Sequence, residues 1–520
     1  MLEDLAALGR RIRAPAAVLR EASESLVGKR VGGGGRRDVL RLTGCVVEGI
    51  ERGPNGCRRE PVTVGAMAGF GEVVAELDVD SGRCLIHAEG WQSWTPTTAY
   101  RIGDQQRLPV RPEVWTWGYG GSRPRPPRRS GAFQGDGLLV VDPGTGEEVV
   151  AVGAMAADQA IPVIRCERIG EGRLVVTADA AVLIIGVDAS GGIEAAKRAF
   201  ADAFAGASGV TGVRAAPTIW CSWYDYFSGI TEADVDENVR AIADRELPVE
   251  VIQLDDGYQR ELGDWLQLSS RFTSLASMVE RIREHGRRAG IWLAPFLVGV
   301  RSAIAAEHPD WIVRDDCGEP VFAIHNWGQD PYALDVTHPG ARDYLTTVLR
   351  AFVDTGFDFF KLDFLYAAAL DGRRFDRSLT GTQAYRQGLA HMRSAVGNDA
   401  YLLGCGAPLL PSVGLVDAMR ISADTSSRWA PADGDMSFPG GDAAELSVHG
   451  RAYQHGRYWV NDPDCLLLGP GVEHRERRVK MVREHGGLRG ISGRVANLDE
   501  WAATTVRELL TTPPPPTPSR

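Results

Sequence analysis

The sequence predicts a multidomain protein, an N-terminal antiparallel β-sandwich followed by a (β/α)8 TIM barrel. Three observations support this fold class. A chain of 520 residues exceeds one ordinary domain. Residues 31–212 carry short apolar segments between turn residues, the pattern of a β-sandwich. Residues 213–511 alternate strand and helix patterns. Residues 1–30 precede the sandwich, and residues 512–520 form a proline-rich tail that we expect to be disordered.

The first domain consists of segments rich in Val, Leu and Thr, separated by Gly, Pro and Asp. This spacing is typical of short antiparallel strands. The expected strands are residues 38–49, 74–79, 138–141, 149–152, 174–177 and 181–187. Helical periodicity occurs only at residues 192–204. Four tryptophans, in Trp91-Gln-Ser-Trp94 and Trp115-Thr-Trp117, lie among polar neighbours. They either pack in a core or between domains, or form a surface for a sugar ring.

From Pro217 onward, strand and helix patterns alternate, which fits a closed barrel better than an open sheet. The expected strands are residues 218–224, 250–254, 291–294, 357–366, 400–404, 418–422, 458–461 and 487–491. The expected helices are residues 231–245, 275–288, 340–355, 382–396, 443–456, 473–484 and 501–510, with a short helix before residue 418.

The strand at residues 357–366 carries Lys361 and Asp363 near its end. Because residues two apart on a strand share a face, we expect the ammonium to lie beside the carboxylate and keep it ionised. An ordinary ion pair at a strand end is the alternative. In a barrel the active site forms at the carboxyl ends of the strands. Polar or aromatic side chains stand at seven of these ends: Trp223, Asp255, Asp256, Trp292, Lys361, Asp363, Cys405, Arg420, Asp424, Asp462 and Asp464.

Each of these carboxylates could instead cap a helix, and each tryptophan could be core. Together they favour sugar chemistry, because two carboxyl groups cleave a glycosidic bond. Asp363 and Asp424 should face each other across the barrel mouth. The adjacent Asp255 and Asp256 should act as a bidentate acceptor for two sugar hydroxyls. The sequence contains no phosphate-binding loop, no His/Cys metal cluster and no Gly-Xaa-Ser-Xaa-Gly motif.

Composition limits the partners and the compartment. The net charge of −11 is spread along the chain, which argues against a nucleic-acid surface. No apolar run is long enough for a membrane span, and the N-terminus is a poor signal peptide. Eight scattered cysteines are typical of free thiols. We therefore expect a cytoplasmic protein, with export through an arginine-pair signal left open, and a homo-oligomer is compatible with the sequence.

Residues 217 to about 470 resemble the α-galactosidases of glycoside hydrolase family 36, which share a clan with family 27. The matching stretches are WCSWYDYF, VIQLDDGY with GDW, GIWLAPF, HPDW, FKLDFL, LGCGAPLLPSVG, MRISADT and NDPDCLLL. They follow the family's order and cover all but the last barrel strand. The Trp-Gln-Ser-Trp stretch is similar to the family's sandwich loop that reaches over the sugar. Because only a short segment follows the eighth expected strand, we expect no counterpart of the family's C-terminal β-domain in these residues.

The resemblance implies a melibiase-like enzyme that removes terminal α-linked galactose with retention, without a metal or cofactor. It implies that Asp363 is the nucleophile and Asp424 the acid/base. Asp255 and Asp256 would bind the galactose 4- and 6-hydroxyls. The resemblance also implies that the other edges of the sugar ring are lined by Lys361, Arg420 and Cys405. It implies that the walls of the site are formed by Trp223, Trp292 and Trp94. We expect Trp94 to be a lid outside the core.

Three alternatives remain open. Two of them, an α-N-acetylgalactosaminidase and an α-galactosyl transferase, would use the same scaffold. The third is a non-catalytic sugar-binding protein, against which the presence of both Asp363 and Asp424 argues. We favour galactose because Cys405 and the following loop should crowd a substituent on C2 of the sugar. The expected ligands are thus small α-galactosides, with neither a nucleic acid nor a membrane as partner.

Overall fold

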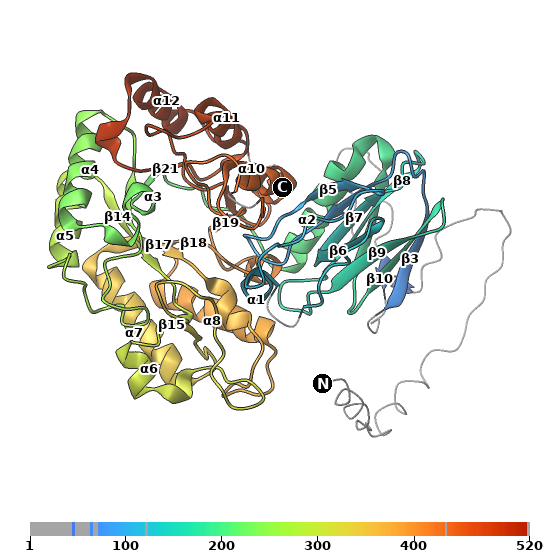
Figure 1. Cartoon of the computed structure of the whole chain (residues 1–520), viewed down its shortest axis with the longest axis horizontal. Coiled ribbons are helices and arrows are strands. Elements are labelled where there is room, and N and C mark those ends of the chain that lie inside the picture. Colours follow the sequence, from blue (N-terminus) through green and yellow to red (C-terminus); the bar gives the residue numbers. More distant parts are fainter. Residues whose placement is uncertain (1–43, 47–62, 66–70, 120–122, 432–433, 517–520) are drawn as a thin grey trace, which may run out of the picture. The chain divides into compact units, whose positions relative to one another are not determined.

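The computed structural model describes residues 44–46, 63–65, 71–119, 123–431 and 434–516 (Figure 1). Within this part of the chain an antiparallel two-sheet unit precedes a barrel of parallel strands, so the predicted fold class is confirmed. The expected N-terminal segment, residues 1–30, lies outside the described residues, as do residues 517–520.

The first unit contains two antiparallel sheets. The larger has the order β1-β2-β11-β8-β7-β4-β5 and the smaller β3-β10-β9-β6. The strands of the larger sheet are β1 (Gly44–Val46), β2 (Thr63–Gly65), β4 (Leu85–Ala88), β5 (Thr98–Arg101), β7 (Leu138–Asp142), β8 (Glu148–Gly153) and β11 (Leu183–Asp188). Those of the smaller sheet are β3 (Glu72–Asp78), β6 (Ala132–Asp136), β9 (Val163–Ile169) and β10 (Arg173–Ala178).

One long helix, α2 (Gly192–Ala207), covers the larger sheet (Figure 1). Its buried face repeats at helical spacing and includes Phe200, Ala201 and Phe204. A Cβ on Gly153 of β8 would come within 2.3 Å of the Phe200 ring, so this glycine allows the helix to approach the sheet closely. A short helix, α1 (Val114–Tyr119), follows β5.

The sequence patterns identified β3, β7, β8, β10, β11 and α2 but missed β2, β4, β5, β6 and β9. The expected strand at residues 38–49 contains β1, and its other residues lie outside the described part of the chain. The missed strands β4 and β5 have only four residues each, too few for alternation to be recognised. In β9, Arg165 and Glu167 take the outward positions while Ile164 and Cys166 are buried. Because only one face of β9 is apolar, its charged residues prevented its recognition as a strand from the sequence.

The barrel has eight parallel strands in the order β20-β19-β18-β17-β14-β13-β12-β21, which confirms the predicted count. They are β12 (Ile219–Cys221), β13 (Val251–Leu254), β14 (Arg288–Leu293), β17 (Phe357–Leu362), β18 (Tyr401–Gly404), β19 (Ala418–Arg420), β20 (Val460–Asp462) and β21 (Gly490–Ser492). Between the outermost strands, the amide of Leu488 donates to the carbonyl of Asn461 at 3.0 Å, and that of Leu466 to Gly490 at 2.8 Å. Two further short strands, β15 (Leu297–Val298) and β16 (Tyr332–Ala333), form a hairpin.

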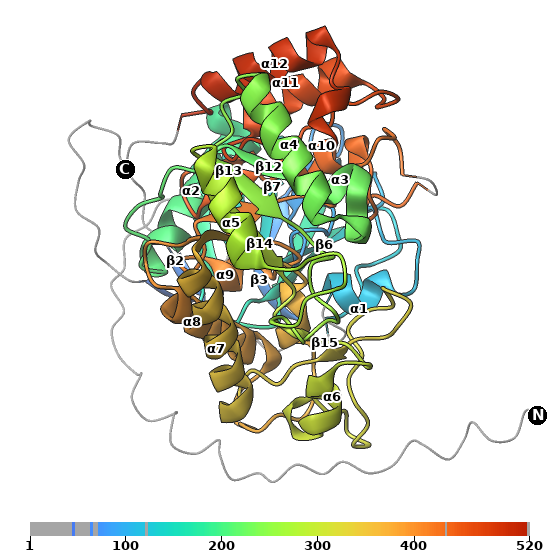
Figure 2. The ribbon, with the colours of Figure 1, turned by 90° about the vertical axis from the view of Figure 1, so that its left-hand side faces the viewer.

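Helices surround these strands, and α4, α5 and α7 lie outside β13 and β14 (Figure 2). The barrel helices are α3 (Trp223–Tyr226), α4 (Glu232–Asp244), α5 (Leu275–Glu284), α6 (Ala303–Glu307), α7 (Pro339–Thr355), α8 (Gly381–Val396), α9 (Leu409–Ser412), α10 (Gly441–Gly450), α11 (Arg475–His485) and α12 (Glu500–Thr511). The 3-10 helices are η1 (Ala189–Gly191), η2 (Phe227–Gly229), η3 (Pro309–Trp311), η4 (Leu365–Ala369), η5 (Ala452–Gln454) and η6 (Val495–Asn497). Thr231 and Thr380 cap α4 and α8 through capping boxes.

The start of the proline-rich tail is hydrogen-bonded to the barrel. The guanidinium of Arg489 donates to the carbonyl of Pro513 at 3.0 Å, and the ring of His455 contacts the carbonyl of Pro515 at 3.2 Å. The expected disorder therefore does not apply to Pro513 and Pro515, and it stays a prediction for residues 517–520.

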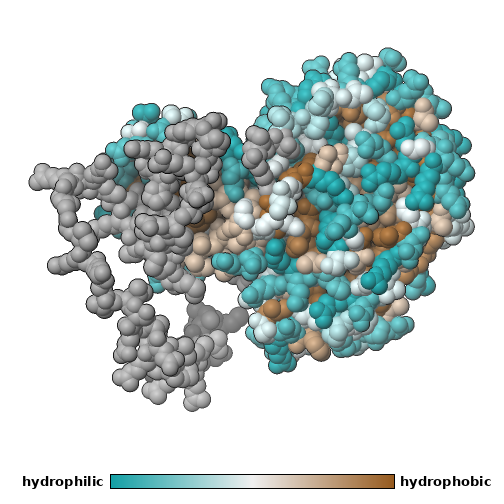
Figure 3. Space-filling model, turned by 180° about the vertical axis from the view of Figure 1, so that it is seen from behind, coloured by the Kyte–Doolittle hydropathy of each residue, from teal (hydrophilic) through white to brown (hydrophobic). Residues whose placement is uncertain are grey.

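Hydrophilic residues predominate on the barrel surface in the view from behind, with apolar residues in smaller groups between them (Figure 3). Of the helices in the described part of the chain, none combines the length and the apolar character that a bilayer crossing requires.

Candidate active site

A cavity of about 350 Å³ opens at the carboxyl ends of the barrel strands. Eight of the ten predicted site residues line it, coming from five barrel strand ends and from the sandwich loop: Trp94, Trp223, Asp255, Asp256, Trp292, Lys361, Asp363 and Asp424. Cys405 and Arg420 are the two that do not. The structure therefore brings both predicted catalytic carboxylates to one cavity.

Asp363 is held by two donors. Its Oδ2 accepts a hydrogen bond of 3.1 Å from the Trp292 indole, and its Oδ1 accepts one of 2.8 Å from the backbone amide of Phe364. The amide is available because the chain turns sharply after β17, where Phe364 has a φ of 51°. Both bonds fix the orientation of the carboxylate.

Lys361 forms the expected ion pair with Asp363 and a second, closer one with Asp255. Its Nζ lies 2.9 Å from Asp255 Oδ2 but 3.8 Å from Asp363 Oδ2. Strand β17 ends at Leu362, so the alternation of a strand no longer governs Asp363. Burial acts to raise the pKa of Asp255, but Lys361 and other donors outweigh it and lower that pKa. Asp255 is therefore an anion.

Asp256 has other hydrogen-bond partners than Asp255, and the expected role of the two carboxylates as a bidentate acceptor for two sugar hydroxyls stays a prediction. Its Oδ2 accepts a hydrogen bond of 2.7 Å from the indole of Trp327, and its Oδ1 accepts one of 2.6 Å from the side-chain amide of Gln259. Burial raises the pKa of Asp256, with the indole and amide donors acting in the opposite direction. Asp255 and Asp256 thus line the cavity in different protein environments.

The carboxyl group of Asp424 is exposed to the cavity, and its surroundings raise its pKa. Its side chain is 34% exposed, and its Oδ1 accepts a 2.9 Å hydrogen bond from Arg420. Dense surroundings and the nearby Asp464 raise the pKa of Asp424 to about 7, even though Arg420 acts to lower it. A carboxyl with such a pKa can release and take up a proton near neutral pH.

Arg420 lies beneath the cavity, which corrects its expected role at the ring edge. It is 3% exposed, and its Nε pairs with Asp462 at 3.0 Å while its second terminal nitrogen pairs with Asp464 at 2.7 Å. Tyr224 donates its hydroxyl hydrogen to Asp464. Asp462 and Asp464, expected in the cavity wall, instead fix the guanidinium that holds Asp424.

Cys405 is completely buried and does not reach the cavity. Burial raises the pKa of its thiol well above the ordinary value. The neighbouring Gly406 explains the placement, because a Cβ there would come within 2.8 Å of the Trp94 ring. Trp94 lies over this loop, so the argument that Cys405 excludes a C2 substituent no longer holds.

Of the sandwich tryptophans with described side chains, only Trp94 lines the cavity. Its ring meets Phe364 edge-on, with centroids 5.1 Å apart and an interplanar angle of 79°. It is 8% exposed, so the expected lid outside the core is in fact packed. Trp91 and Trp115 are buried, which corresponds to the packing alternative.

Several cavity residues escaped the sequence patterns because they follow no strand directly. Trp327 lies in the long loop between β14 and α7, where no periodicity marked it, and Phe364 follows the predicted nucleophile. Arg111 and Glu113 come from the sandwich domain, and Phe438 from the loop before α10. Arg111 stacks on Phe438 at 3.5 Å, a contact that only the folded chain brings together.

Within the described ranges, no group of three or more His, Cys, Asp or Glu side chains is arranged to hold a metal ion. The chemistry that the cavity offers is that of its carboxyl groups. Asp363 accepts two hydrogen bonds, Asp424 retains a proton near neutral pH, and indole and ammonium groups surround both.

Known proteins resemble this chain over its barrel and, in one case, over nearly its full length. The Melibiase family model matches residues 214–391. A curated "A type blood alpha-D-galactosamine galactosaminidase" of Flavonifractor plautii is 34% identical over 128 residues, 23% of this chain and 12% of the relative. "Alpha-galactosidase 2" of Pediococcus pentosaceus is 24% identical over 156 residues, 28% of this chain and 21% of the relative. The matched stretches thus span less than a quarter of these curated relatives.

A solved structure is similar over a wider range. It is an α-galactosidase from Thermus thermophilus in complex with p-nitrophenyl α-D-galactopyranoside. The sequences are 27% identical, the TM-score is 0.72, and the match covers 91% of this chain and 92% of that one. The similarity therefore includes the sandwich as well as the barrel.

Proposed function

We propose that the chain, whose residues 214–391 match the Melibiase family model, is a retaining, exo-acting α-galactosidase. It would hydrolyse terminal α-linked galactose from oligosaccharides by double displacement. In the first step Asp363 attacks the anomeric carbon while Asp424 protonates the leaving oxygen. In the second, Asp424 removes a proton from water, which displaces Asp363 from the sugar.

The observation that carries this proposal is the contrast between the two carboxyl groups in one cavity. Asp363 accepts hydrogen bonds from Trp292 and Phe364, as a nucleophile that must stay ionised requires. The pKa of Asp424 is raised to about 7, as an acid that must carry a proton and then lose it requires. The Thermus α-galactosidase, similar over 91% of this chain, supports the substrate class.

The binding roles follow the lining of the cavity. We assign sugar hydroxyls to Asp255, Asp256 and Lys361, whose polar groups line the cavity. We assign the walls to Trp223, Trp292 and Trp94. Arg420 positions Asp424 through its 2.9 Å hydrogen bond, and Gly406, next to Cys405, leaves room for the Trp94 ring.

A second candidate is an α-galactosaminidase on the same scaffold. It is favoured by the Flavonifractor relative, whose name describes an α-D-galactosamine galactosaminidase. Burial of Cys405 also removes the residue that was expected to exclude a C2 substituent. Galactosyl transfer uses the same covalent step with a sugar acceptor in place of water.

A comparison of three p-nitrophenyl glycosides tests the assignment: α-galactoside, α-galactosaminide and α-N-acetylgalactosaminide. We expect the highest kcat/KM for the α-galactoside, and initial release of α-galactose as seen by NMR. Preference for either amino sugar would establish the second candidate. Absence of turnover with all three, together with galactose binding, would identify a non-catalytic binding protein.

The same proposal includes the organisation and location of the protein. The sandwich would comprise residues 31–212 and the catalytic barrel residues 213–511. Small α-galactosides are the proposed ligands, in the cytoplasm, without a nucleic acid or a membrane as partner. Limited proteolysis between the two proposed domains would test the boundary.

A further inference from the structure

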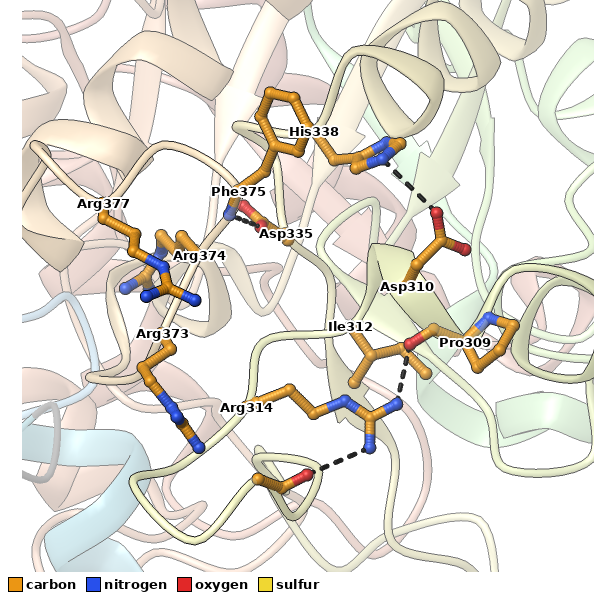
Figure 4. A pocket seen from close by; sticks show the side chains of 11 residues that line it. Pro309, Asp310, Ile312, Arg314, Asp335, His338, Arg373, Arg374, Phe375 and Arg377 are labelled. Atoms are coloured by element: carbon orange, nitrogen blue, oxygen red, sulfur yellow. Dashed lines mark hydrogen bonds and ion pairs between the residues drawn. The ribbon is translucent and has the colours of Figure 1, made fainter.

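A second cavity, of about 630 Å³, lies between two barrel loops (Figure 4). The loop between β14 and α7 contributes Arg314, and the loop between β17 and α8 contributes Arg373, Arg374 and Arg377. Both loops leave the carboxyl ends of their strands. The same loops also contribute Trp327 and Phe364 to the first cavity. The second cavity is therefore on the catalytic face, with its own set of lining residues.

The four guanidinium groups of this cavity lack carboxylate partners. Among the described residues, none of them forms an ion pair within 4.0 Å. Arg314 donates to the carbonyl of Pro309 at 2.7 Å, and Arg373 to the carbonyls of Asp315 and Asp316 at 2.8 and 3.0 Å. Arg377 is exposed and has no hydrogen bond to another described residue. A guanidinium stays charged in proteins, so the cavity holds four positive charges.

Arg374 carries the most direct evidence for a ligand. It is only 6% exposed, and its buried Nε has no hydrogen-bond partner among the described residues. Its terminal nitrogens donate to main-chain carbonyls, which leaves the positive charge without a paired anion. Burying an unpaired charge is costly, and an anion in the cavity would offset that cost.

Neither of the two carboxylates in the lining forms an ion pair with these arginines, although Asp335, and Asp371 outside the lining, act electrostatically on Arg374. Asp310 lies 3.4 Å from His338 and is exposed. The Oδ1 atom of Asp335 accepts a hydrogen bond from the Thr337 hydroxyl, and its Oδ2 atom accepts one of 2.6 Å from the backbone amide of Phe375. Asp335 therefore links the two loops. Four arginines against two aspartates leave an excess of positive charge in a chain whose net charge is −11.

We propose that this cavity binds a small organic anion through a carboxylate, phosphate or sulfate group. Forked guanidinium donors match the oxygens of all three groups. The volume of about 630 Å³ is within the range of small-molecule sites, so the ligand is larger than a bare ion. Phe375, 63% exposed at this cavity, offers an apolar face for the rest of the molecule.

Calorimetric titration of the full chain tests the proposal with three probes: inorganic phosphate, inorganic sulfate and glucuronate, each against chloride at equal ionic strength. The key variant is Arg377→Glu, because that side chain makes no bond that the fold needs. We expect at least one probe to bind and Arg377→Glu to weaken it by about tenfold or more. Arg350→Glu, at an exposed position on α7, should bind like the unaltered protein.

A competition with galactose separates the two cavities. Saturating galactose should leave anion binding unchanged, since the sugar would occupy the first cavity. The probe with the lowest dissociation constant identifies the group that the ligand carries. The proposal is overturned if none of the probes binds, if Arg377→Glu binds as tightly as Arg350→Glu, or if galactose displaces the anion.

Discussion

Two carboxyl groups of the same chemical type acquire opposite properties in this cavity. Asp363 receives an indole N–H and a main-chain N–H. Asp424 shares its surroundings with Asp464, and its pKa is raised to about 7. A nucleophile must be ionised before reaction, and an acid must be protonated at that moment. The surroundings of each carboxyl group, rather than the residue type, therefore indicate that Asp363 is the nucleophile and Asp424 the acid.

Asp363→Ala should abolish turnover and leave the melting temperature nearly unchanged, because the covalent step requires this carboxylate. Azide should restore part of the activity by attacking the sugar from the vacated side, which yields the β-galactosyl azide. Rates and the product configuration can be measured with p-nitrophenyl α-galactoside. Normal turnover in the variant would remove Asp363 from the proposed role.

Asp424→Ala should retain the first step with a good leaving group and slow the second. A burst of p-nitrophenol is the expected signature. In the unaltered enzyme, turnover of a poor leaving group should fall as pH rises through about 7, because Asp424 then loses the proton it donates. The variant should lack this alkaline decline. Equal losses on good and poor leaving groups would contradict the assignment.

At the scale of single elements, the sandwich loop at residues 90–97 is held in a defined shape. The side chain of Gln92 accepts from the amide of Trp94 at 2.8 Å, and a Cβ on Gly90 would come within 2.2 Å of Thr95 Oγ1. The amide of Ser93 donates to the carbonyl of Ala407 at 3.0 Å, which joins the loop to the barrel. Trp94 is thus both cavity wall and packing residue.

Trp94→Ala should weaken galactose inhibition by about three- to tenfold, since aromatic contacts of this kind contribute about 0.5–1.5 kcal/mol beyond area burial. Stability should also fall, by about 3 kcal/mol or more, because the ring is mostly buried. This replaces the expectation for a lid outside the core. Trp501→Ala, at a position that is 39% exposed on α12, is the matched control and should alter neither property strongly. Unchanged inhibition would restrict Trp94 to packing.

At the scale of the whole molecule, a buried ion pair joins the sandwich loop to the barrel. Arg451 is fully buried and its Nε donates to Glu89 at 2.8 Å. Its terminal nitrogens donate to the carbonyls of Ser93, Thr95 and Ile421 at 2.7–2.8 Å. Burial acts to raise the pKa of Glu89, but Arg451 and His87 outweigh it and lower that pKa to about 2.

Arg451→Met should reduce the free energy of unfolding by about 3–5 kcal/mol, because it leaves Glu89 buried without its partner. Arg477→Met removes an arginine that is 54% exposed, and should cost only about 0–1 kcal/mol. Urea denaturation of both variants makes the comparison. A similar loss of unfolding free energy in Arg451→Met and Arg477→Met would show that the buried Arg451–Glu89 pair does not hold the domains together.

The same pair should stabilise the protein in a defined pH range. Because the folded pKa of Glu89, about 2, lies below its ordinary value of 4.5, the stabilisation is present above about pH 4.5. It is lost as pH falls toward 2. The acid limb of the stability curve should therefore be shallower for Arg451→Met, which lacks the partner that lowers this pKa.

The sequence by itself determined the barrel and its catalytic candidates. Alternation of apolar strands and amphipathic helices is a local property, so the eight strands could be placed, and the carboxyl end of each strand follows from chain direction. Asp363 and Asp424 were found because Asp363 follows β17 directly and Asp424 lies four residues after the end of β19. The residue stretches of the family resemblance then supplied their roles.

Only the tertiary structure decided which side chains reach the cavity. Arg420 and Cys405 lie at strand ends but are buried beneath it, while Trp327 and Glu113 arrive from a loop and from the other domain. Lys361 pairs with Asp255 as well as with Asp363, because folding places β13 only one strand away from β17, although the two are far apart in sequence. Periodicity in the sequence predicts which face of a helix or strand is buried, but not which residues of other elements it contacts. Burial and pKa depend on those contacts, which only folding creates.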